Sequence, residues 1–317
     1  MAQPTGVYSV YDASGTTGVG KGNREDLLNT VYDISPTETV TLTALGRSTA
    51  DAVLHEWTTH ALAAAAANEK IEGDDAVIDA ETAKTRLNNR TAIANKTAGV
   101  TDTQQAVSKV GMRDAMGEAV MYKMREIKRD VNFMLHQNTA KVAGNDTTAR
   151  KAAGIPTWIL NSVAVGASPT GDGSDTATNG TQRPLTESQL LDASQLAYDD
   201  GGSPTLLVTG AFNKRVISGF GGNQNRNADA SDKKLINSVV FYEDDFNVMK
   251  CVADRQAVSR NAVGIDTEYM KVAYLRAYET KALARTGSAE RKQIETEWTL
   301  EVCNPDAHFI IRDLTTS

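Results

Sequence analysis

The glycine-rich stretch from Gly15 to Lys21 is the nearest match in this sequence to a site that could do chemistry. It reads G-T-T-G-V-G-K and fits the G-x-x-x-x-G-K part of a phosphate-binding loop. Gly22 follows, where such loops carry Ser or Thr to supply a hydroxyl to magnesium. No series of parallel strands and crossover helices is indicated after it. The pattern favours a flexible glycine-rich arm, and a nucleotide hydrolase using Lys21 is the enzymatic alternative.

A second near-match is H-E-W-T-T-H, from His55 to His60. The zinc-protease motif H-E-x-x-H has one residue fewer between its histidines. At about 100° per residue the two imidazoles would lie roughly 140° apart on a helix, and in a strand they would face opposite sides. They could not share one zinc ion. We expect both histidines to be structural or exposed to solvent.

The remaining reactive residue types indicate no catalytic, metal or cofactor site. No Gly-x-Ser-x-Gly turn is present, and Cys251 and Cys303 lie far apart, which predicts free buried thiols in a reducing compartment. Adjacent acidic pairs occur in turn-like surroundings, and adjacent basic pairs are scattered. These pairs are Asp74–Asp75, Asp199–Asp200, Asp244–Asp245, Arg150–Lys151, Lys214–Arg215 and Arg291–Lys292. Solvated faces or subunit contacts explain them better than nucleic-acid recognition does.

The composition is that of a globular protein. Of 317 residues, 40% are hydrophobic and 23% charged, with a net charge of -7 that argues against a general basic surface for DNA. The longest apolar run, Ala61 to Ala67, is far shorter than the roughly 20 residues that cross a bilayer. The first residues lack the basic and apolar regions of a secretory signal, so we expect synthesis and folding in the cytoplasm.

The first 50 residues predict an extended arm with one short helix. A strand-like run, Val7 to Tyr11, precedes the glycine-rich turn. Asn23 can cap a helix that ends at Ser35, because the residue before a proline avoids helical geometry. The apolar residues of that helix share one face: Leu27, Leu28 and Val31.

The next segment predicts a strand followed by a projecting hairpin. Val53 to His60 alternates with the period of a strand, and a strand-like stretch follows from Arg86 to Lys96. No aromatic residue occurs between Trp57 and Tyr122. Because so few bulky side chains cannot build a separate core, we expect a long hairpin supported by neighbouring chains.

Apolar residues at helical spacing then predict one amphipathic helix from Arg113 to Asn138. These residues are Met116, Val120, Met124, Ile127, Val131 and Met134. A helix of 26 residues would extend roughly 39 Å at about 1.5 Å per residue. Its other face carries charges of both signs, at Arg125, Glu126, Arg129 and Asp130.

The second half of the chain predicts an α/β lobe and then an antiparallel sheet. An exposed loop, 165–183, precedes a helix that has a capping box at Thr186 and Gln189 and ends at Gly201-Gly202. A strand, a helix and two more strands are expected at 205–209, 212–217, 239–242 and 248–252. Alternation along 270–278 and 294–302, followed by a strand at 309–311, predicts a sheet with one wet face.

This order of elements resembles the major capsid protein of tailed bacteriophages, whose fold is shared by encapsulins and the herpesvirus capsid floor. The stretches that carry the resemblance are Asn23-Arg-Glu-Asp-Leu27, Ile34-Ser-Pro-Thr-Glu-Thr39, Val53-Leu-His-Glu-Trp57, Met121-Tyr-Lys-Met124 and Asp130-Val131. The resemblance covers nearly the whole chain. It implies an α+β capsid fold, and a tail-tube or encapsulin-like particle is the structural alternative.

The resemblance also implies a division of the chain. An N-terminal arm covers 1–50, a strand and extended loop 51–110, a peripheral domain with a spine helix 111–156, an inserted α/β axial domain 157–262, and a return to the peripheral domain in antiparallel strands 263–317. Pentamers and hexamers of the chain would form an icosahedral shell. Subunit contacts are expected at Gly18, Gly20, Lys21, Arg24, Ile71, Val77, Ile78, Arg90, Arg125 and Arg129.

The partners implied are further copies of the chain, a portal and a possible decoration protein. A separate scaffolding protein is also expected, since no scaffold-like extension precedes the arm. The shell would enclose double-stranded DNA without sequence-specific contacts, and no membrane is involved. We expect assembly in the host cytoplasm and a final place in the virion.

Overall fold

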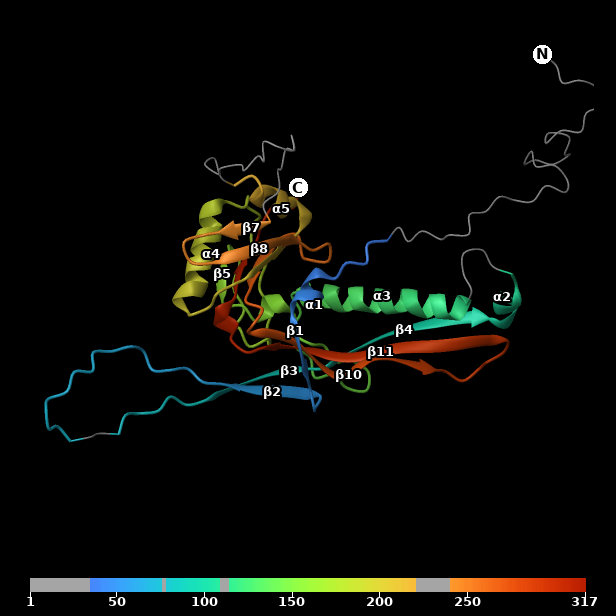
Figure 1. Cartoon of the computed structure of the whole chain (residues 1–317), viewed down its shortest axis with the longest axis horizontal. Coiled ribbons are helices and arrows are strands. Elements are labelled where there is room, and N and C mark those ends of the chain that lie inside the picture. Colours follow the sequence, from blue (N-terminus) through green and yellow to red (C-terminus); the bar gives the residue numbers. More distant parts are fainter. Residues whose placement is uncertain (1–34, 76–77, 109–113, 221–239) are drawn as a thin grey trace, which may run out of the picture.

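A computed structural model describes residues 35–75, 78–108, 114–220 and 240–317 (Figure 1). The expected strand at 7–11, the glycine-rich turn and the expected helix up to residue 34 lie outside these ranges. The elements in chain order are α1 (Val40–Ala44), β1 (Gly46–Thr49), β2 (Leu54–Thr59), β3 (Thr85–Arg90), β4 (Ala92–Thr101), α2 (Asp102–Ala106), α3 (Ala115–His136), a 3-10 turn (Ile155–Thr157), β5 (Asn161–Val163), α4 (Glu187–Asp199), β6 (Leu206–Thr209), α5 (Ala211–Ile217), β7 (Phe241–Glu243), β8 (Val248–Ala253), β9 (Ala262–Ile265), β10 (Met270–Ala282), β11 (Ala289–Val302), a second 3-10 turn (Pro305–Ala307) and β12 (Phe309–Ile311).

The predicted long helix is confirmed as α3, although it is shorter at both ends than expected. Asp114 caps its first turn by accepting a hydrogen bond from the N–H of Met116 at 3.0 Å, and Gln137 leaves helical geometry. Its 22 residues extend about 33 Å at about 1.5 Å each. Ile127, Val131 and Leu135 are fully buried. The apolar stripe therefore faces the core, as its periodicity predicts.

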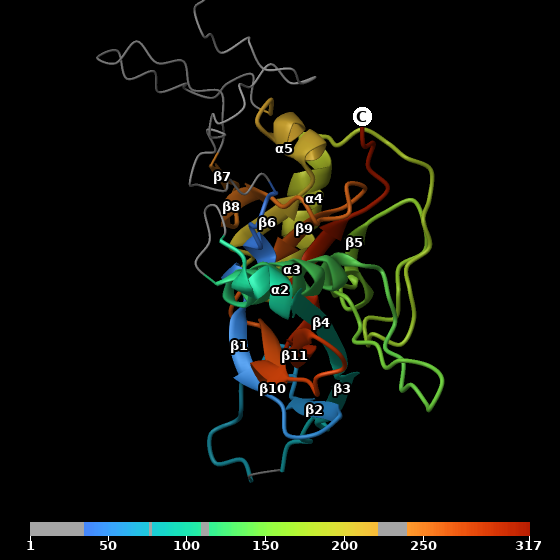
Figure 2. The same ribbon diagram turned by 90° about the vertical axis from the view of Figure 1, so that its right-hand side faces the viewer.

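A four-stranded sheet in the order β1-β10-β11-β4 lies under α3 (Figures 1 and 2). β11 pairs antiparallel with both β10 and β4, and β1 runs parallel to β10. Ile294, Trp298 and Leu300 of β11 are buried in the same core as α3. These strands confirm the antiparallel sheet predicted for the C-terminal region.

The expectation of one wet face is wrong for the middle of β11. Glu297 and Thr299 point away from Trp298 yet are also buried. The hydroxyl of Thr299 donates to the carbonyl of Arg90 at 2.9 Å, so the end of β3 lies over this second face. Another segment of the chain therefore replaces water there, and an alternating pattern alone does not reveal such a cover.

The projecting hairpin is also shorter than expected. β2 pairs with β3, but β4 continues into the four-stranded sheet and pairs with β11 along 92–101. The stretch Arg86 to Lys96 therefore contributes to two sheets, with Thr91 between them. The chain between β2 and β3 projects from the body, and its described residues are all exposed (Figure 1).

The α/β lobe contains a six-stranded sheet in the order β5-β12-β9-β6-β8-β7. The helix predicted from the capping box is confirmed as α4, in which Thr186 and Gln189 bond reciprocally. α4 and α5 cover one face through Leu190, Ala197 and Ile217. The opposite face contributes Leu206, Val208 and other residues to the core shared with α3.

The last strand belongs to this lobe and not to the antiparallel sheet, which corrects the expected division at residue 262. β9 spans that boundary, and β12 pairs with β9 and β5. Phe309 and Ile311 face the core under α4, while Ile310 enters the other core. A strand with both faces buried must lie inside a sheet that is covered on both sides. β12 does so, because it lies between β5 and β9 with a core on each face.

Candidate subunit interfaces

The loop between β2 and β3 carries large apolar side chains with almost no cover. Leu62 is 87% exposed, Ile71 82% and Ile78 97%. Acidic residues outnumber lysines by six to two between residues 60 and 84. An isoleucine side chain that is more than 80% exposed is unfavourable in water, and burial against another surface would lower the free energy. Ile71 and Ile78 are therefore left uncovered within a single chain, and Val77 lies outside the described residues.

The base of this loop is firmly held. The indole N–H of Trp57 donates to the carbonyl of Val302 at 2.8 Å, and its ring lies 5.5 Å from that of Trp158. His55 bonds Glu301 at 3.3 Å. Burial alone would raise the pKa of Glu301, but hydrogen bonds from Ser48 and His55 lower it overall. The projecting residues are thus carried by a rigid base.

His55 is a structural residue, as expected, and His60 is exposed at the end of β2. Within the described ranges, no group of three or more His, Cys, Asp or Glu side chains is arranged to hold a metal ion. No helix in the same ranges has the length and apolar character needed to cross a bilayer. Cys251 is a buried free thiol, whereas Cys303 is only half-buried.

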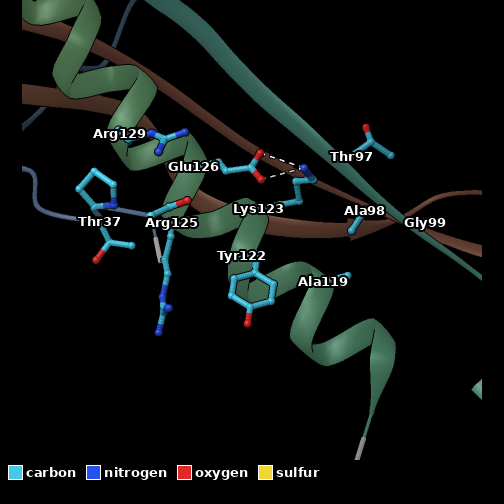
Figure 3. A pocket seen from close by; sticks show the side chains of 12 residues that line it. Thr37, Thr97, Ala98, Gly99, Ala119, Tyr122, Lys123, Arg125, Glu126 and Arg129 are labelled. Carbon is cyan, nitrogen blue, oxygen red and sulfur yellow. Dashed lines mark hydrogen bonds and ion pairs between the residues drawn. The ribbon is translucent and has the colours of Figure 1, made fainter. Parts of the chain in front are cut away.

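The charged residues of α3 do not all face solvent. Lys96 of β4 reaches Asp130 at 2.7 Å and Glu126 at 3.9 Å, so this edge of the helix is tied to the sheet. Arg125 and Arg129 lie on the other side of the helix, next to Thr37 (Figure 3). Both line a groove of about 530 Å³. Glu126 lines this groove as well, so the mixed-sign face combines ion-paired residues with the two arginines.

Arg90 has a different environment from the other candidates. It ends β3 and is half-buried. Its positive charge contributes to lowering the pKa of Lys141, although burial of Lys141 is the larger cause. The Lys141 ammonium donates to the carbonyls of Asn88 and Asp172 at 3.0 and 2.8 Å. The surroundings of Arg90 are those of a residue inside the subunit.

The candidate contact residues are not gathered at one place. Gly18, Gly20, Lys21 and Arg24 lie outside the described residues. The projecting loop, the end of β3 and the outward face of α3 hold the rest. Such separation is typical of an assembling subunit, which uses several surfaces, and not of a catalytic site, which needs converging groups.

A buried polar cluster that the sequence did not indicate joins the arm to both cores. Asp254, after β8, accepts hydrogen bonds from the hydroxyl of Thr41 at 3.0 Å and the amide of Asn132 at 2.8 Å. The ring of His136 lies 2.8 Å from that hydroxyl. All four residues are at most 3% exposed. The cluster therefore fixes α1, α3 and the six-stranded sheet relative to one another.

The electrostatics of this cluster favour an ionised carboxylate. Burial alone would raise the pKa of Asp254, but hydrogen bonds from His136, Asn132 and the N–H of Gln256 hold it far below its ordinary value. Asn132 and His136 stand one turn apart on α3 beside its apolar stripe. That pair of polar residues is the one signal in the sequence that could have revealed the cluster.

A family model, the SU10 major capsid protein, matches residues 10–315 of this chain. The chain belongs to the SU10 major capsid protein family. It is a major capsid protein of the tailed-phage type, as its sequence resemblance implied. No curated protein matches this capsid protein.

Solved structures with the same fold include capsid subunits. One, described as the "Cyanophage A-1(L) capsid asymmetric unit", has a TM-score of 0.64 at 13% identity and covers 93% of this chain and 98% of its own. A chain from Microbacterium phage Oxtober96 has a TM-score of 0.61 at 15% identity, with 92% and 96% covered. A third, "Capsid of native GTA particle computed with C5 symmetry", has 0.62 at 11%, with 98% and 100% covered. At these identities the likeness establishes the fold of this capsid protein, including its mixed helices and sheets.

Proposed function

We propose that this capsid protein assembles as pentamers and hexamers into an icosahedral shell that encloses double-stranded DNA. The observation that carries the proposal is the loop between β2 and β3, where Ile71 and Ile78 are 82% and 97% exposed on a rigid base. Burying one such side chain contributes roughly 1.5–3 kcal/mol. A shell repeats each contact many times, so weak single contacts suffice.

Each part of the chain has a role in the proposed shell. The loop between β2 and β3 and the N-terminal arm contact neighbouring subunits. The six-stranded lobe, with α4 and α5, gathers at the centre of a pentamer or hexamer. The four-stranded sheet with α3 forms the peripheral domain and meets other capsomers. A later expansion flattens the subunit and tightens the loop and arm contacts.

We further propose partners and a location. A portal and a scaffolding protein take part in assembly in the host cytoplasm, and a decoration protein can bind the finished virion. DNA is enclosed without sequence-specific contacts, in keeping with the net charge of -7. We assign no catalytic residue. The dispersed candidate residues and the failed match of the glycine-rich stretch at Gly22 support a structural role.

Substitutions in the projecting loop test the proposal. The Ile71→Asp/Ile78→Asp chain is expected to fold normally, because both side chains lie outside the cores, but to form at least about tenfold fewer shells, since two apolar contacts per subunit are lost. The Ala80→Asp/Thr82→Asp chain adds the same charge at exposed positions of the same loop and is the matched control.

Shell yield is measured by sedimentation and electron microscopy, and folding by circular dichroism. The loop assignment requires the isoleucine variant to fall well below the control. Equal yields from the two variants would show that the loop does not carry the subunit contacts.

A further inference from the structure

A groove of about 530 Å³ follows the outward face of α3 (Figure 3). It lies between residues 35–37, just before α1, and residues 97–99 of β4. Tyr122, Ala119 and Pro36 give it apolar surface. It therefore offers both apolar contact and charge to a chain segment placed along the helix.

The charge of the groove is positive. Among the described residues that line it, three are basic, Lys123, Arg125 and Arg129, and one is acidic, Glu126. Lys123 donates to both carboxylate oxygens of Glu126 at 2.9 Å. Arg125 and Arg129 add two further positive charges to the lining of the groove. An occupant that complements this surface carries carboxylates.

The described chain begins at this groove, because Ser35 is one of the residues that line it. The preceding segment, residues 23–34, needs no linker to reach the groove, and tethering gives it a high effective concentration there. Its twelve residues would extend roughly 18 Å at about 1.5 Å each if helical. The stretch of α3 from Ala119 to Arg129 extends roughly 16 Å by the same measure.

The sequence of that segment complements the groove. It contains three acidic residues, Glu25, Asp26 and Asp33, against one basic residue, Arg24. Leu27, Leu28 and Val31 supply apolar side chains for the surface around Tyr122. Charge, apolar content and length all agree with the groove.

We propose that residues 23–34 bind in the α3 groove of their own chain, with carboxylates at Arg125 and Arg129. This arrangement leaves residues 1–22, including the glycine-rich stretch, as the part of the arm that extends to other subunits. The inference goes beyond the proposed function, since it applies to an unassembled subunit as well as to a shell.

Limited digestion of the full, unassembled chain with chymotrypsin tests this binding. Tyr32 is a cleavage site within the segment, and charge substitutions leave it unchanged. Cleavage at Tyr32 in the Arg125→Glu/Arg129→Glu chain is expected to be about tenfold faster than in the unsubstituted chain, since two ionic attractions become repulsions. Adding Glu25→Lys and Asp26→Lys to that chain should restore protection.

The matched control is Lys128→Glu, to be compared with Arg129→Glu alone. Lys128 is the adjacent residue on α3, but its ammonium lies over the ring of Tyr278 at 5.9 Å, away from the groove. We expect Lys128→Glu to leave the cleavage rate unchanged. Circular dichroism checks that each variant folds, and if the arginine variant does not, Glu25→Lys/Asp26→Lys alone provides the same test.

Two results overturn the proposal. Equal cleavage at Tyr32 in the unsubstituted chain and in the charge-reversed chains would show that the segment does not use the groove. Protection that rises with chain concentration would place the segment on a neighbouring copy instead of its own. Neither result bears on shell formation, so failure here is distinguishable from failure of the proposed function.

Discussion

Replacing Asp254 by alanine is the change within one subunit that we expect to cost the most stability. Its carboxylate accepts from the N–H of Thr41 at 3.2 Å, the hydroxyl of Thr41 at 3.0 Å and the amide of Asn132 at 2.8 Å. The N–H of Gln256 donates to it at 2.9 Å. Hydrogen bonds to a charged group contribute about 1.5–3 kcal/mol each, and a buried donor left without an acceptor costs about 1–3 kcal/mol.

These contributions do not add, because water can enter the vacated space and satisfy some of the donors. We therefore expect a loss of about 3–5 kcal/mol in the free energy of unfolding for Asp254→Ala. Asp254→Asn keeps the shape and one acceptor oxygen, and should lose roughly half as much.

Urea unfolding of the unassembled chain, followed by tryptophan fluorescence, measures both variants. Trp158 is fully buried in the core that α1 and α3 share with the sheets, so its fluorescence reports unfolding of that core. The protein concentration is kept constant, since association stabilises folded chains. A loss below about 1 kcal/mol for Asp254→Ala would refute the view that this cluster fixes the arm and the two cores together.

Two further predictions concern the same body. The pKa of Asp254 is lowered from 3.8, so the ionised carboxylate stabilises the fold above about pH 4, and this stabilisation is lost as the pH falls. The difference in the free energy of unfolding between the unsubstituted chain and Asp254→Asn should therefore shrink when unfolding is measured at acid pH. A side-chain carbon at Gly264 would overlap the ring of Phe309, so Gly264→Ala should lower the melting temperature and the free energy of unfolding, the latter by about 1–3 kcal/mol. At Gly99 the added carbon would lie at an ordinary contact distance from Arg291, so Gly99→Ala should change the free energy of unfolding by less than about 1 kcal/mol. Equal effects of the two glycine substitutions, or a pH-independent difference at Asp254, would count against these predictions.

Elements with a strong local pattern could be predicted from the sequence. The stripe containing Ile127 and Val131 repeats at the period of a helix, and Thr186 with Gln189 marks the start of α4. These signals depend on residues within one or two turns of each other. For the same reason helix ends were less accurate, as α3 begins only after its cap at Asp114.

Features that depend on distant residues could not be predicted. Phe309–Ile311 reads as a strand, but its place beside β9 and β5 depends on which surfaces the rest of the chain leaves open. Asp254 and Thr41 are 213 positions apart, and no local pattern connects them. Ile71 and Ile78 are conspicuous in the sequence only once their surroundings are known to be bare. Contacts with other copies of the chain are harder still to predict, because they depend on surfaces that form only after each chain has folded.

Electron microscopy of the purified chain tests the central claim most directly. A subunit with a rigid body, a projecting apolar loop and a capsid fold is expected to form closed, roughly spherical shells built from pentamers and hexamers. A chain that stays monomeric under every condition that supports its fold, or that forms only open tubes, would contradict the account.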